Sequence, residues 1–371
     1  YCYFYIYKRV IKNKLKNHKP KILVAPLNWG LGHATRCIPI IRQLLDHGFE
    51  PIIASDGVAL QLLQKEFPEL MFLKLPSYQI EYAKNGIFFK WKMIKNSPKI
   101  MEAIYKEKKL VKKWIKEYGL VGVISDNRLG VYSKKVPSVF ITHQLNVMTG
   151  NTSWITSKMH QYIIKKFDEC WVPDIAEKPN LSGKLGHLKK PFLKTTYIGP
   201  LSRFEKQELP KRYNLMVVLS GPEPQRTILE KHLRKEVLRY KGEVVFVCGK
   251  IESEQSVEIK GHVTYYNFMT SKELEKTFNE SEIVLSRSGY TTVMDLAMLE
   301  KKAFFIPTPG QYEQEYLARK YKKEGLIPFA KQDEFTIENL NETHVYKGLP
   351  RRHVDTYWKK LLLLFKGERE L

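Results

Sequence analysis

The sequence predicts an α/β protein with two domains, each built around a mainly parallel sheet. Short apolar runs alternate with amphipathic stretches along most of the chain, which is typical of strands and helices that follow one another in parallel sheets. A polar stretch at 178–194, with two glycines and two prolines, interrupts this alternation before a second cycle begins. The length of 371 residues is enough for two domains of ordinary size.

The first domain is expected over residues 21–198, after a basic N-terminal extension at 1–20. Residues 21–27 form an apolar run that ends in a glycine-rich turn, and an amphipathic helix is expected at 34–47. This succession of strand, glycine loop and helix is typical of the start of a parallel sheet. The further strands of the domain are expected at 51–54, 71–75, 121–125, 138–141 and 169–172.

The second domain is expected over residues 199–350, with a linker near 199–214. Its strands are expected at 215–219, 243–248, 262–265, 282–285 and 303–306. Its helices are expected at 225–239, 272–279, 290–299 and 312–324. The last segment, 351–371, contains an amphipathic helix at 354–365, which we expect to pack back on the N-terminal domain.

The composition is that of a globular protein, but the charge is unusual. Lysine and arginine number 62 and aspartate and glutamate 39, which gives a net charge of +23. Such an excess favours an anionic partner: nucleic acid, a phospholipid surface or a phosphorylated small molecule. The four cysteines form no CxxC pair, which argues against a disulfide framework or a zinc site and suits a reducing cytosol. No apolar run is long enough to span a membrane, and the apolar residues 1–6 precede basic ones, the reverse of a signal peptide.

The first candidate site is the loop at 28–36, between the first strand and its helix. Gly30 and Gly32 allow the backbone to approach a ligand closely, and the N-terminus of the following helix attracts anions. His33 stands at the mouth of this loop, where an imidazole can act as a base at neutral pH. The alternative is a histidine at a helix N-terminus with no role. The loop is not GxGxxG, so a nicotinamide cofactor is not expected.

Small residues follow two strands of the second domain. Ser220 and Gly221 come directly after one strand, Ser288 and Gly289 come after another, and a helix begins soon after each pair. A hydroxyl and free N–H groups at a helix N-terminus suit a phosphate. An ordinary turn between strand and helix is the alternative for 219–226, because two prolines make it an unusual phosphate cradle.

The helix after Gly289 continues this pattern. Thr291 and Thr292 place hydroxyls in its first turn, and Asp295, one turn further on, offers a carboxylate to a ribose diol. Phosphate contact followed by a diol-binding carboxylate is what a nucleotide diphosphate needs. After the next strand come three residues whose amides and carboxylate suit the hydroxyls of a sugar: Gln311, Glu313 and Gln314.

At these residues the sequence resembles glycosyltransferase family 28. The family signature is Ser-Gly-x-x-Thr-x-x-Glu, an apolar strand, proline and a glutamine-rich turn, and 288–295, 303–307 and 311–318 are similar to it. The likeness is specific over about 197–330 and limited to isolated motifs in the N-terminal half. It implies a GT-B architecture, in which two Rossmann-like domains face each other across a cleft and the donor nucleotide lies mainly on the second.

The resemblance also implies roles for residues of the second half. Asp295 takes the ribose position, where the family usually has glutamate, and Gln314 corresponds to the glutamine that contacts sugar hydroxyls. Arg203, in a stretch similar to the family's motif between the domains, is expected near the diphosphate. Met269, with Phe268, falls where the family's backbone holds uracil, so the expected donor is a UDP-sugar.

In the first half, 30–33 is similar to the family's Gly-Gly-His loop, which places His33 toward the reacting centre. His143 lies in a stretch that resembles the family's His-Glu-Gln-Asn, but Gln144 replaces the carboxylate. Asp126, at the end of a strand, is then the better carboxylate candidate. We expect a single, inverting displacement in which His33 or Asp126 deprotonates the acceptor hydroxyl. No Asp-x-Asp occurs, which argues against a metal-bridged diphosphate and favours a reaction that requires no cofactor.

Much of the basic excess lies at 84–116, where eleven lysines are interleaved with aromatic and aliphatic residues. This pattern favours a patch that binds an anionic membrane surface. A solvated, lysine-rich helix over an ordinary core is the alternative. The family's acceptors are often lipid-linked, so the resemblance implies a lipid-linked or envelope-glycan acceptor. It also implies a cytoplasmic protein, peripheral on the inner face of the plasma membrane.

Three other functions remain open at this point. A nucleotide-sugar hydrolase has the same loop and uses water as acceptor, and an epimerase has a similar two-domain fold. A nucleic-acid-binding protein is the least favoured, because the sequence has no RNP motif, zinc-ligand spacing or arginine-rich tract.

Overall fold

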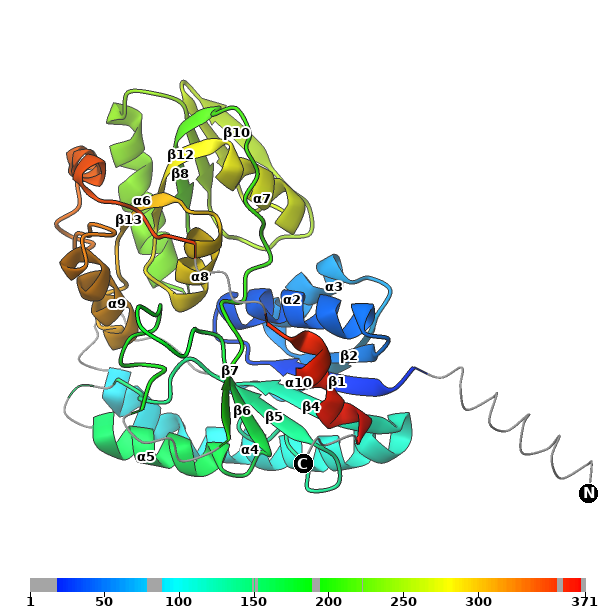
Figure 1. The fold of residues 1–371 in the computed structure, drawn as a ribbon. Coiled ribbons are helices and arrows are strands. Elements are labelled where there is room, and N and C mark those ends of the chain that lie inside the picture. Colours follow the sequence, from blue (N-terminus) through cyan, green and yellow to red (C-terminus); the bar gives the residue numbers. More distant parts are fainter. Residues whose placement is uncertain are drawn as a thin grey trace, which may run out of the picture.

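The computed structural model describes residues 19–78, 89–148, 150, 153–188, 194–221, 223–351 and 356–367, and the backbone alone over 89–97. It contains two mainly parallel sheets, each flanked by helices, which lie one above the other in Figure 1. The predicted α/β class is confirmed. The N-terminal extension falls mostly on residues 1–18, which lie outside the described residues.

The first sheet belongs to the N-terminal half. Its parallel strands, from edge to edge, are β3 (Met71–Lys74), β2 (Glu50–Ser55), β1 (Lys21–Pro26), β4 (Leu120–Asp126), β5 (Ser138–Ile141), β6 (Glu169–Val172) and β7 (Thr195–Tyr197). The chain order reverses between β1 and β4, where Pro26 is the register partner of Asp126. Open parallel sheets bind ligands outside the carboxyl ends of their strands at such a reversal.

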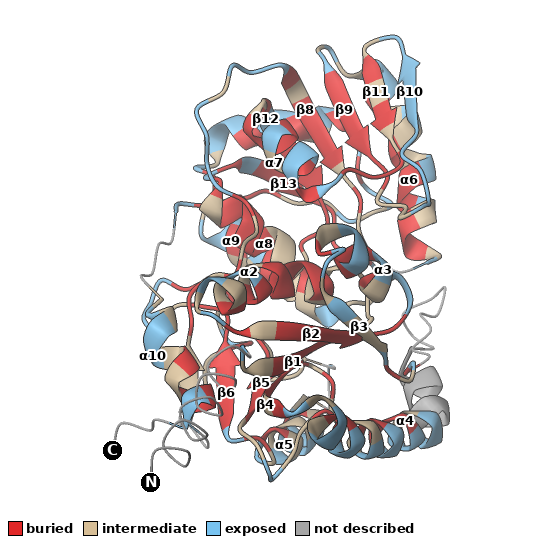
Figure 2. Cartoon of the chain, turned by 90° about the vertical axis from the view of Figure 1, so that its right-hand side faces the viewer, coloured by how far each residue is buried: buried red, intermediate tan, exposed pale blue. Residues whose placement is uncertain are grey.

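The helices of this half are α2 (Gly32–Asp46), α3 (Gly57–Glu66), α4 (Phe89–Tyr118) and α5 (Ser153–Ile164). The long helix α4 forms because its apolar residues recur on one face, where Ala103, Val111 and Trp114 are buried. Figure 2 shows buried positions on the sheet side of α4 and exposed ones on its outer side. Of the basic stretch predicted at 84–116, residues 84–88 lie outside the described residues.

The second sheet belongs to the C-terminal half. Its order is β10 (Val257–Lys260), β11 (Val263–Tyr266), β9 (Val244–Val247), β8 (Tyr213–Val218), β12 (Ser281–Ser286) and β13 (Lys302–Phe305). All pairs are parallel except the one between β10 and β11. The chain order reverses between β8 and β12, the two strands that precede the predicted phosphate-binding residues.

The helical segments of this half are α6 (Gln225–Glu236), η3 (Val237–Arg239), α7 (Ser271–Asn279), α8 (Tyr290–Met298), α9 (Tyr312–Lys323) and η4 (Ile337–Val345). Helix α7 begins with a capping box in which Thr270 and Glu273 satisfy each other's backbone N–H groups. The loops before α6, α8 and α9 all start at the carboxyl ends of strands, so they gather at one edge of the sheet.

The chain ends on the first sheet. Helix α10 (Trp358–Leu362) and the turn η5 (Leu363–Lys366), red in Figure 1, return to the N-terminal half. The Phe365 ring packs edge-on against Trp171 of β6 and against Phe49. The helix is shorter than expected, and residues 354 and 355 of the predicted helix lie outside the described residues.

The two halves contact each other directly. Helices α2 and α8 pack together, and one core cluster contains buried residues of both sheets, such as Val24 and Phe305. The Tyr290 hydroxyl donates to the Pro173 carbonyl at 2.8 Å. The described part of the polar stretch expected as a loop at 178–194 contacts α9, where Tyr321 donates to the Leu181 carbonyl at 2.7 Å. The carboxyl ends of the two sheets are thereby held face to face.

Several short elements were not located from the sequence, among them β7, β10, α3 and η4. Strand β10 is exposed at every residue, and its alternation of apolar and charged residues covers only four positions. Strand β7 has only three residues, and helix α3 is amphipathic over just ten. Among the described residues, no helix has the length and apolar character that a membrane span requires.

Candidate active site

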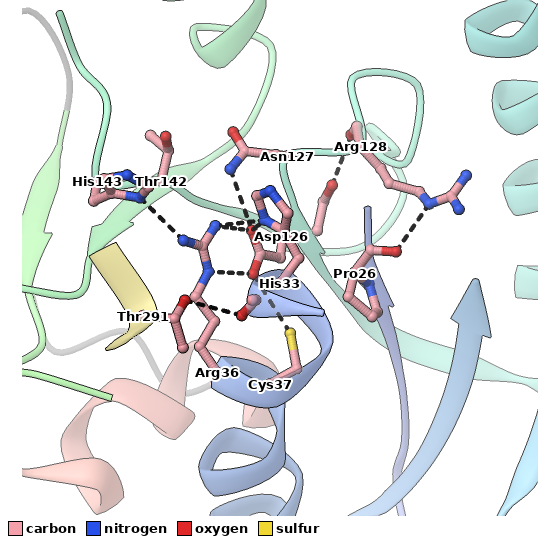
Figure 3. Close-up of polar contacts among 12 residues, drawn as sticks. Pro26, His33, Arg36, Cys37, Asp126, Asn127, Arg128, Thr142, His143 and Thr291 are labelled. Atoms are coloured by element: carbon pink, nitrogen blue, oxygen red, sulfur yellow. Dashed lines mark hydrogen bonds and ion pairs between the residues drawn. The ribbon is translucent and has the colours of Figure 1, made fainter. Parts of the chain in front are cut away.

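The site begins at the reversal point of the first sheet. Asp126 is the last residue of β4, and His33 lies in the first turn of α2, directly after the glycine loop that follows β1. The Nδ1 atom of His33 is 2.9 Å from Oδ1 of Asp126 (Figure 3). Two residues 93 positions apart in the sequence therefore form one unit, because their strands are neighbours in the sheet.

Arg36 completes this unit. One turn after His33 on α2, it donates to both carboxylate oxygens of Asp126 through Nε and Nη2, and the carboxylate is fully buried. Burial alone would raise the pKa of Asp126, but the charges of Arg36 and His33 outweigh it and hold the pKa well below its usual range. Asp126 is therefore an anion at neutral pH.

The imidazole of His33 faces a different environment. Burial lowers its pKa below the ordinary value, against the opposing attraction of Asp126. About 14% of the side chain remains exposed, whereas Asp126 has no exposure. At neutral pH His33 is thus an uncharged imidazole with a path to solvent, which a base needs, and Asp126 is a buried anion behind it.

The glycine loop touches the opposite half of the molecule. The Thr291 hydroxyl, in the first turn of α8, donates to the Gly32 carbonyl at 3.1 Å. A Cβ atom at Gly32 would lie 3.0 Å from Thr291 Oγ1, so a larger residue would require the Thr291 side chain to shift. Gly30 has a φ of +76°, which favours glycine. The geometry of the loop therefore explains why Gly30 and Gly32 are both glycine.

His143 follows β5 at the same sheet edge, and the two halves also meet there. Its Nδ1 atom is 3.0 Å from Nη1 of Arg36, and its Nε2 atom is 3.0 Å from Oε1 of Glu313 on α9. Gln144 donates its amide to the second carboxylate oxygen of Glu313. The imidazole of His143 stacks on the Tyr290 ring, with centroids 4.3 Å apart and planes 9° apart. Glu313 thus bridges the halves.

On the opposite side, the loops after β12 and β13 hold each other. Ser288 is fully buried and donates its hydroxyl to the Gln314 carbonyl at 2.8 Å, while the Gln314 Oε1 atom accepts the Thr308 N–H at 2.8 Å. Gln314 Nε2 lies 4.0 Å from where a Cβ atom of Gly289 would stand. The predicted phosphate and sugar loops are therefore one connected structure.

The next two predicted residues are Asp295, on α8, and Arg203, in the segment between β7 and β8. The Ser202 hydroxyl donates to Oδ1 of Asp295 at 2.7 Å. Burial raises the pKa of Asp295 to about 6, although Arg203 and Ser202 oppose the shift. Arg203 donates from Nη1 to the Ser271 hydroxyl at 3.0 Å, and its buried Nε atom has no hydrogen-bond partner.

The predicted uracil segment is covered by the first half. Met269 is 9% exposed, and the ammonium of Lys65, at the end of α3, lies 4.4 Å from the centre of the Phe268 ring. Lys65 also donates to the Glu252 carbonyl at 2.7 Å. Its neighbour Glu66 accepts hydrogen bonds from the backbone and the hydroxyl of Ser271.

Comparison with known families identifies glycosyltransferases as relatives of the chain. Residues 216–352 match the model of the glycosyltransferase family 28 C-terminal domain. The UDP-N-acetylglucosamine–N-acetylmuramyl-(pentapeptide) pyrophosphoryl-undecaprenol N-acetylglucosamine transferase of Buchnera aphidicola is 23% identical over 319 residues, 83% of this chain and 84% of the relative. The enzyme of the same name from Clostridium tetani is 23% identical over 326 residues, 84% of this chain and 86% of the relative.

Solved structures share the whole architecture. Acinetobacter baumannii MurG has a TM-score of 0.53 at 13% identity and covers 94% of this chain and 100% of its own. The glycosyltransferase of kitacinnamycin has a TM-score of 0.58 at 12% identity, with 88% and 89% covered. The chain is a glycosyltransferase of the GT-B fold.

In this glycosyltransferase most predicted site residues lie at the two facing sheet edges. His33, Asp126 and His143 share one hydrogen-bonded group, and Glu313 joins it from the second half. The hydroxyls of Ser288 and Thr291 are engaged within the protein, so these two residues organise loops in this structure. The remaining predicted residues stand at the ends of their strands or in the first turns of their helices: Ser220, Gly221, Thr292 and Gln311.

Sequence reasoning missed Arg36. A signal was present, because Arg36 follows His33 by three residues and so lies on the same face of the helix, one turn on. Among the described residues, no group of three or more histidine, cysteine, aspartate or glutamate side chains is arranged to hold a metal ion.

Proposed function

We propose that the protein transfers a hexosyl group from a UDP-sugar to a hydroxyl of a lipid-linked or envelope-glycan acceptor, with inversion and without a metal ion. The observation that carries this proposal is the His33–Asp126 pair facing the N-terminus of α8 across the contact between the halves. The donor is inferred from the names of the curated relatives and from a similar solved glycosyltransferase, LpCGTa, in complex with UDP (TM-score 0.56, 12% identity).

The first part of the mechanism is proton removal. The Nδ1 atom of His33 lies 2.9 Å from Oδ1 of Asp126 and 2.8 Å from Nη2 of Arg36. In the proposed tautomer the proton is on Nδ1 and is donated to Asp126, which leaves the Nε2 lone pair free for the acceptor hydroxyl. His33 takes the hydroxyl proton as the acceptor oxygen attacks the anomeric carbon. A new bond forms between this carbon and the acceptor oxygen, and the bond to the diphosphate oxygen breaks, so UDP leaves with the electron pair. One displacement at the anomeric carbon inverts its configuration.

The second part is stabilisation of the leaving diphosphate. The N-terminus of α8 and the backbone at Ser220 and Gly221 offer N–H groups, and Gly221 has a φ of +107°, which favours glycine. Arg203 adds a cation whose buried Nε lacks a partner. Asp295 would exchange its Ser202 contact for a ribose diol, while Gln311 and Gln314 would hold the sugar. We also propose the domain division at 198/199 with the C-terminal segment 351–371 returning to the first domain.

A lipid-linked acceptor requires the protein to work at a membrane, and one surface suits this. In Figures 1 and 2, α4 and α5 run along the same side of the first sheet. Six large apolar side chains on them are between 44% and 67% exposed: Met101, Tyr105, Trp154, Ile155, Met159 and Tyr162. Lysines lie over three of these rings, with Lys109, Lys158 and Lys166 at 4.7–5.3 Å. Aromatic rings beside lysines suit an anionic lipid surface.

Donor binding tests the first part of the proposal. Thermal unfolding is recorded with UDP, GDP and ADP at equal concentrations, because a ligand that binds only the folded protein raises the melting temperature. UDP is expected to give the largest shift, and Arg203→Met to remove most of it. Equal shifts for the three nucleotides, or none, would contradict the donor assignment.

Flotation with vesicles of phosphatidylglycerol and phosphatidylcholine tests the surface. The protein is expected to float with the vesicles at moderate salt, and the double variant W154S/Y162S to remain largely in the soluble fraction. Ile259→Ser is the matched control, since Ile259 is 72% exposed on the distant strand β10. Absence of flotation, or equal flotation of the double variant and the control, would contradict the membrane surface.

A further inference from the structure

Glu313 has an unexpected place for a residue predicted to bind the donor sugar. Both of its carboxylate oxygens are engaged by the opposite half of the molecule, one by His143 and the other by Gln144. Only 16% of the Glu313 side chain is exposed, and 6% of His143. The bridge is therefore buried in the contact between the halves, where a hydrogen bond to a charged group is stronger than in water.

The contacts of His143 with Arg36 and Glu313 determine which of its two ring nitrogens carries the proton. A guanidinium can only donate, so Nδ1 of His143 accepts from Arg36. The neutral ring then carries its proton on Nε2 and donates it to Glu313. Arg36, held on one side by His143, donates to both oxygens of Asp126, which is the partner of His33. A continuous chain of hydrogen bonds thus leads from Glu313 on α9 to the proposed base on α2.

The sequence around His143 is consistent with this chain of hydrogen bonds. The family 28 motif that resembles 142–146 has a carboxylate where this chain has Gln144. Here the carboxylate at this place comes from Glu313 of the other half, and Gln144 is its hydrogen-bond donor. The acceptor side of the site therefore receives its second carboxylate only when the two halves are in contact.

We propose that Glu313 is a positioning residue which, through His143 and Arg36, sets the His33–Asp126 pair, so that the base is complete only when the donor half is docked on the acceptor half. The inference rests on the proposed transferase function and names a regulation of the same site. Water attack on a bound donor is then slow in the open protein, because the base is not aligned until the halves meet.

Swapping the carboxylate of Glu313 and the amide of Gln144 distinguishes a positioning role of Glu313 from direct binding of the donor sugar. E313Q removes the charge and is expected to lower kcat about 10–100-fold, the usual range for a residue that orients a reacting group, with the donor KM little changed. The double variant Q144E/E313Q returns a carboxylate to the same contact from the other side and is expected to recover most of kcat. Glu324→Gln, on the exposed end of the same helix, is the charge-matched control and should behave as wild type.

A second measurement tests the positioning role of Glu313 without an activity assay. Hydrogen–deuterium exchange is measured for peptides covering 30–37 and 142–148. E313A is expected to raise exchange in both, and Q144E/E313Q to match the wild type. If E313Q raises the donor KM and the double variant is no better, or if E313A leaves exchange unchanged, the inference is wrong. If the wild type turns over no UDP-sugar but E313A raises exchange in both peptides, the proposed function fails and the positioning chain stands.

Discussion

The Nδ1 atom of His33 lies 2.9 Å from Oδ1 of Asp126, and Asp126 is fully buried behind it. The carboxylate can therefore orient the imidazole but cannot itself reach a substrate. Of the two bases that the sequence left open, this relationship favours His33 as the proposed base, with Asp126 as its partner. It also places the proposed chemistry where the first sheet reverses its chain order, the position that general rules for parallel sheets predict.

Asp126→Asn tests this division of roles. The amide preserves the shape but loses the anion that keeps the proton on Nδ1 of His33. We expect kcat to fall by about two to four orders of magnitude, by comparison with the effect of changing the carboxylate in hydrolase triads. UDP binding, measured by calorimetry, should change little. A variant with kcat within threefold of wild type would contradict the orienting role.

The pH dependence of kcat follows from the lowered pKa of His33. A base must be unprotonated, so kcat should be level at neutral pH and fall only below pH 6.5, the ordinary value for histidine. The groups that face His33 are Asp126, Arg36 and His143, and the first attracts its proton while the other two repel it. In the Asp126→Asn variant the acid limb should therefore move to lower pH. The measurement uses saturating UDP-sugar, so that donor binding does not contribute.

Asp295 links stability to donor binding. Because its folded pKa is raised to about 6, folding is favoured by the protonated form, and this contribution is complete below the ordinary pKa and lost as pH rises through 6. Above pH 7 the ionised, buried carboxylate destabilises the protein by about 3 kcal/mol at most, from the size of the shift. Asp295→Asn should thus be more stable than wild type at pH 8 and equally stable near pH 4, but bind UDP more weakly. Denaturant unfolding at the two pH values checks this; a variant less stable at pH 8 would contradict it.

The C-terminal segment is expected to be part of the first domain's core. Phe365 is 4% exposed against Trp171, so Phe365→Ala should lower the free energy of unfolding by about 3 kcal/mol and change the Trp171 fluorescence. Gly122→Ala should also destabilise the protein, because its Cβ atom would lie 2.1 Å from Cδ1 of the Phe365 ring. The double variant should be no less stable than Phe365→Ala alone. Additive losses would contradict the contact; Tyr357→Ala, 69% exposed, is the control.

Much of the fold was predictable because apolar periodicity reports burial. The runs at 21–27 and 215–219 correspond to β1 and β8, whose residues are almost entirely buried on both faces. Strand β10 was not recognised because it lies at the sheet edge and its apolar–polar alternation covers only four residues. For the basic stretch at 84–116 a helix was only the alternative interpretation, and the structure shows that residues 89–118 form one. The exposed rings of α5, such as Trp154, were not singled out, because a sequence alone does not report which side chains are exposed.

The site was predictable in its types of residue and less so in its partners. His33 and Asp126 follow from their places after neighbouring strands, but their pairing depends on strand order, which the sequence does not state. Arg36 was overlooked because an arginine inside a helix usually reads as a solvated charge. Glu313 was assigned to the sugar from its neighbours in the chain, whereas its contacts in the structure come from residues about 170 positions away. Such contacts require three-dimensional coordinates.

The most direct test of the account compares the rates of UDP release by the wild type and by His33→Ala. The assay uses a panel of UDP-hexoses with a membrane lipid extract as the source of acceptor, and UDP binding is measured in parallel by calorimetry. We expect the wild type to release UDP only when the extract is present, and His33→Ala to bind UDP equally well but release it at least a hundredfold more slowly, in the range for loss of a general base. Equal rates for the two proteins would contradict the central claim that His33 is the base of a sugar transfer.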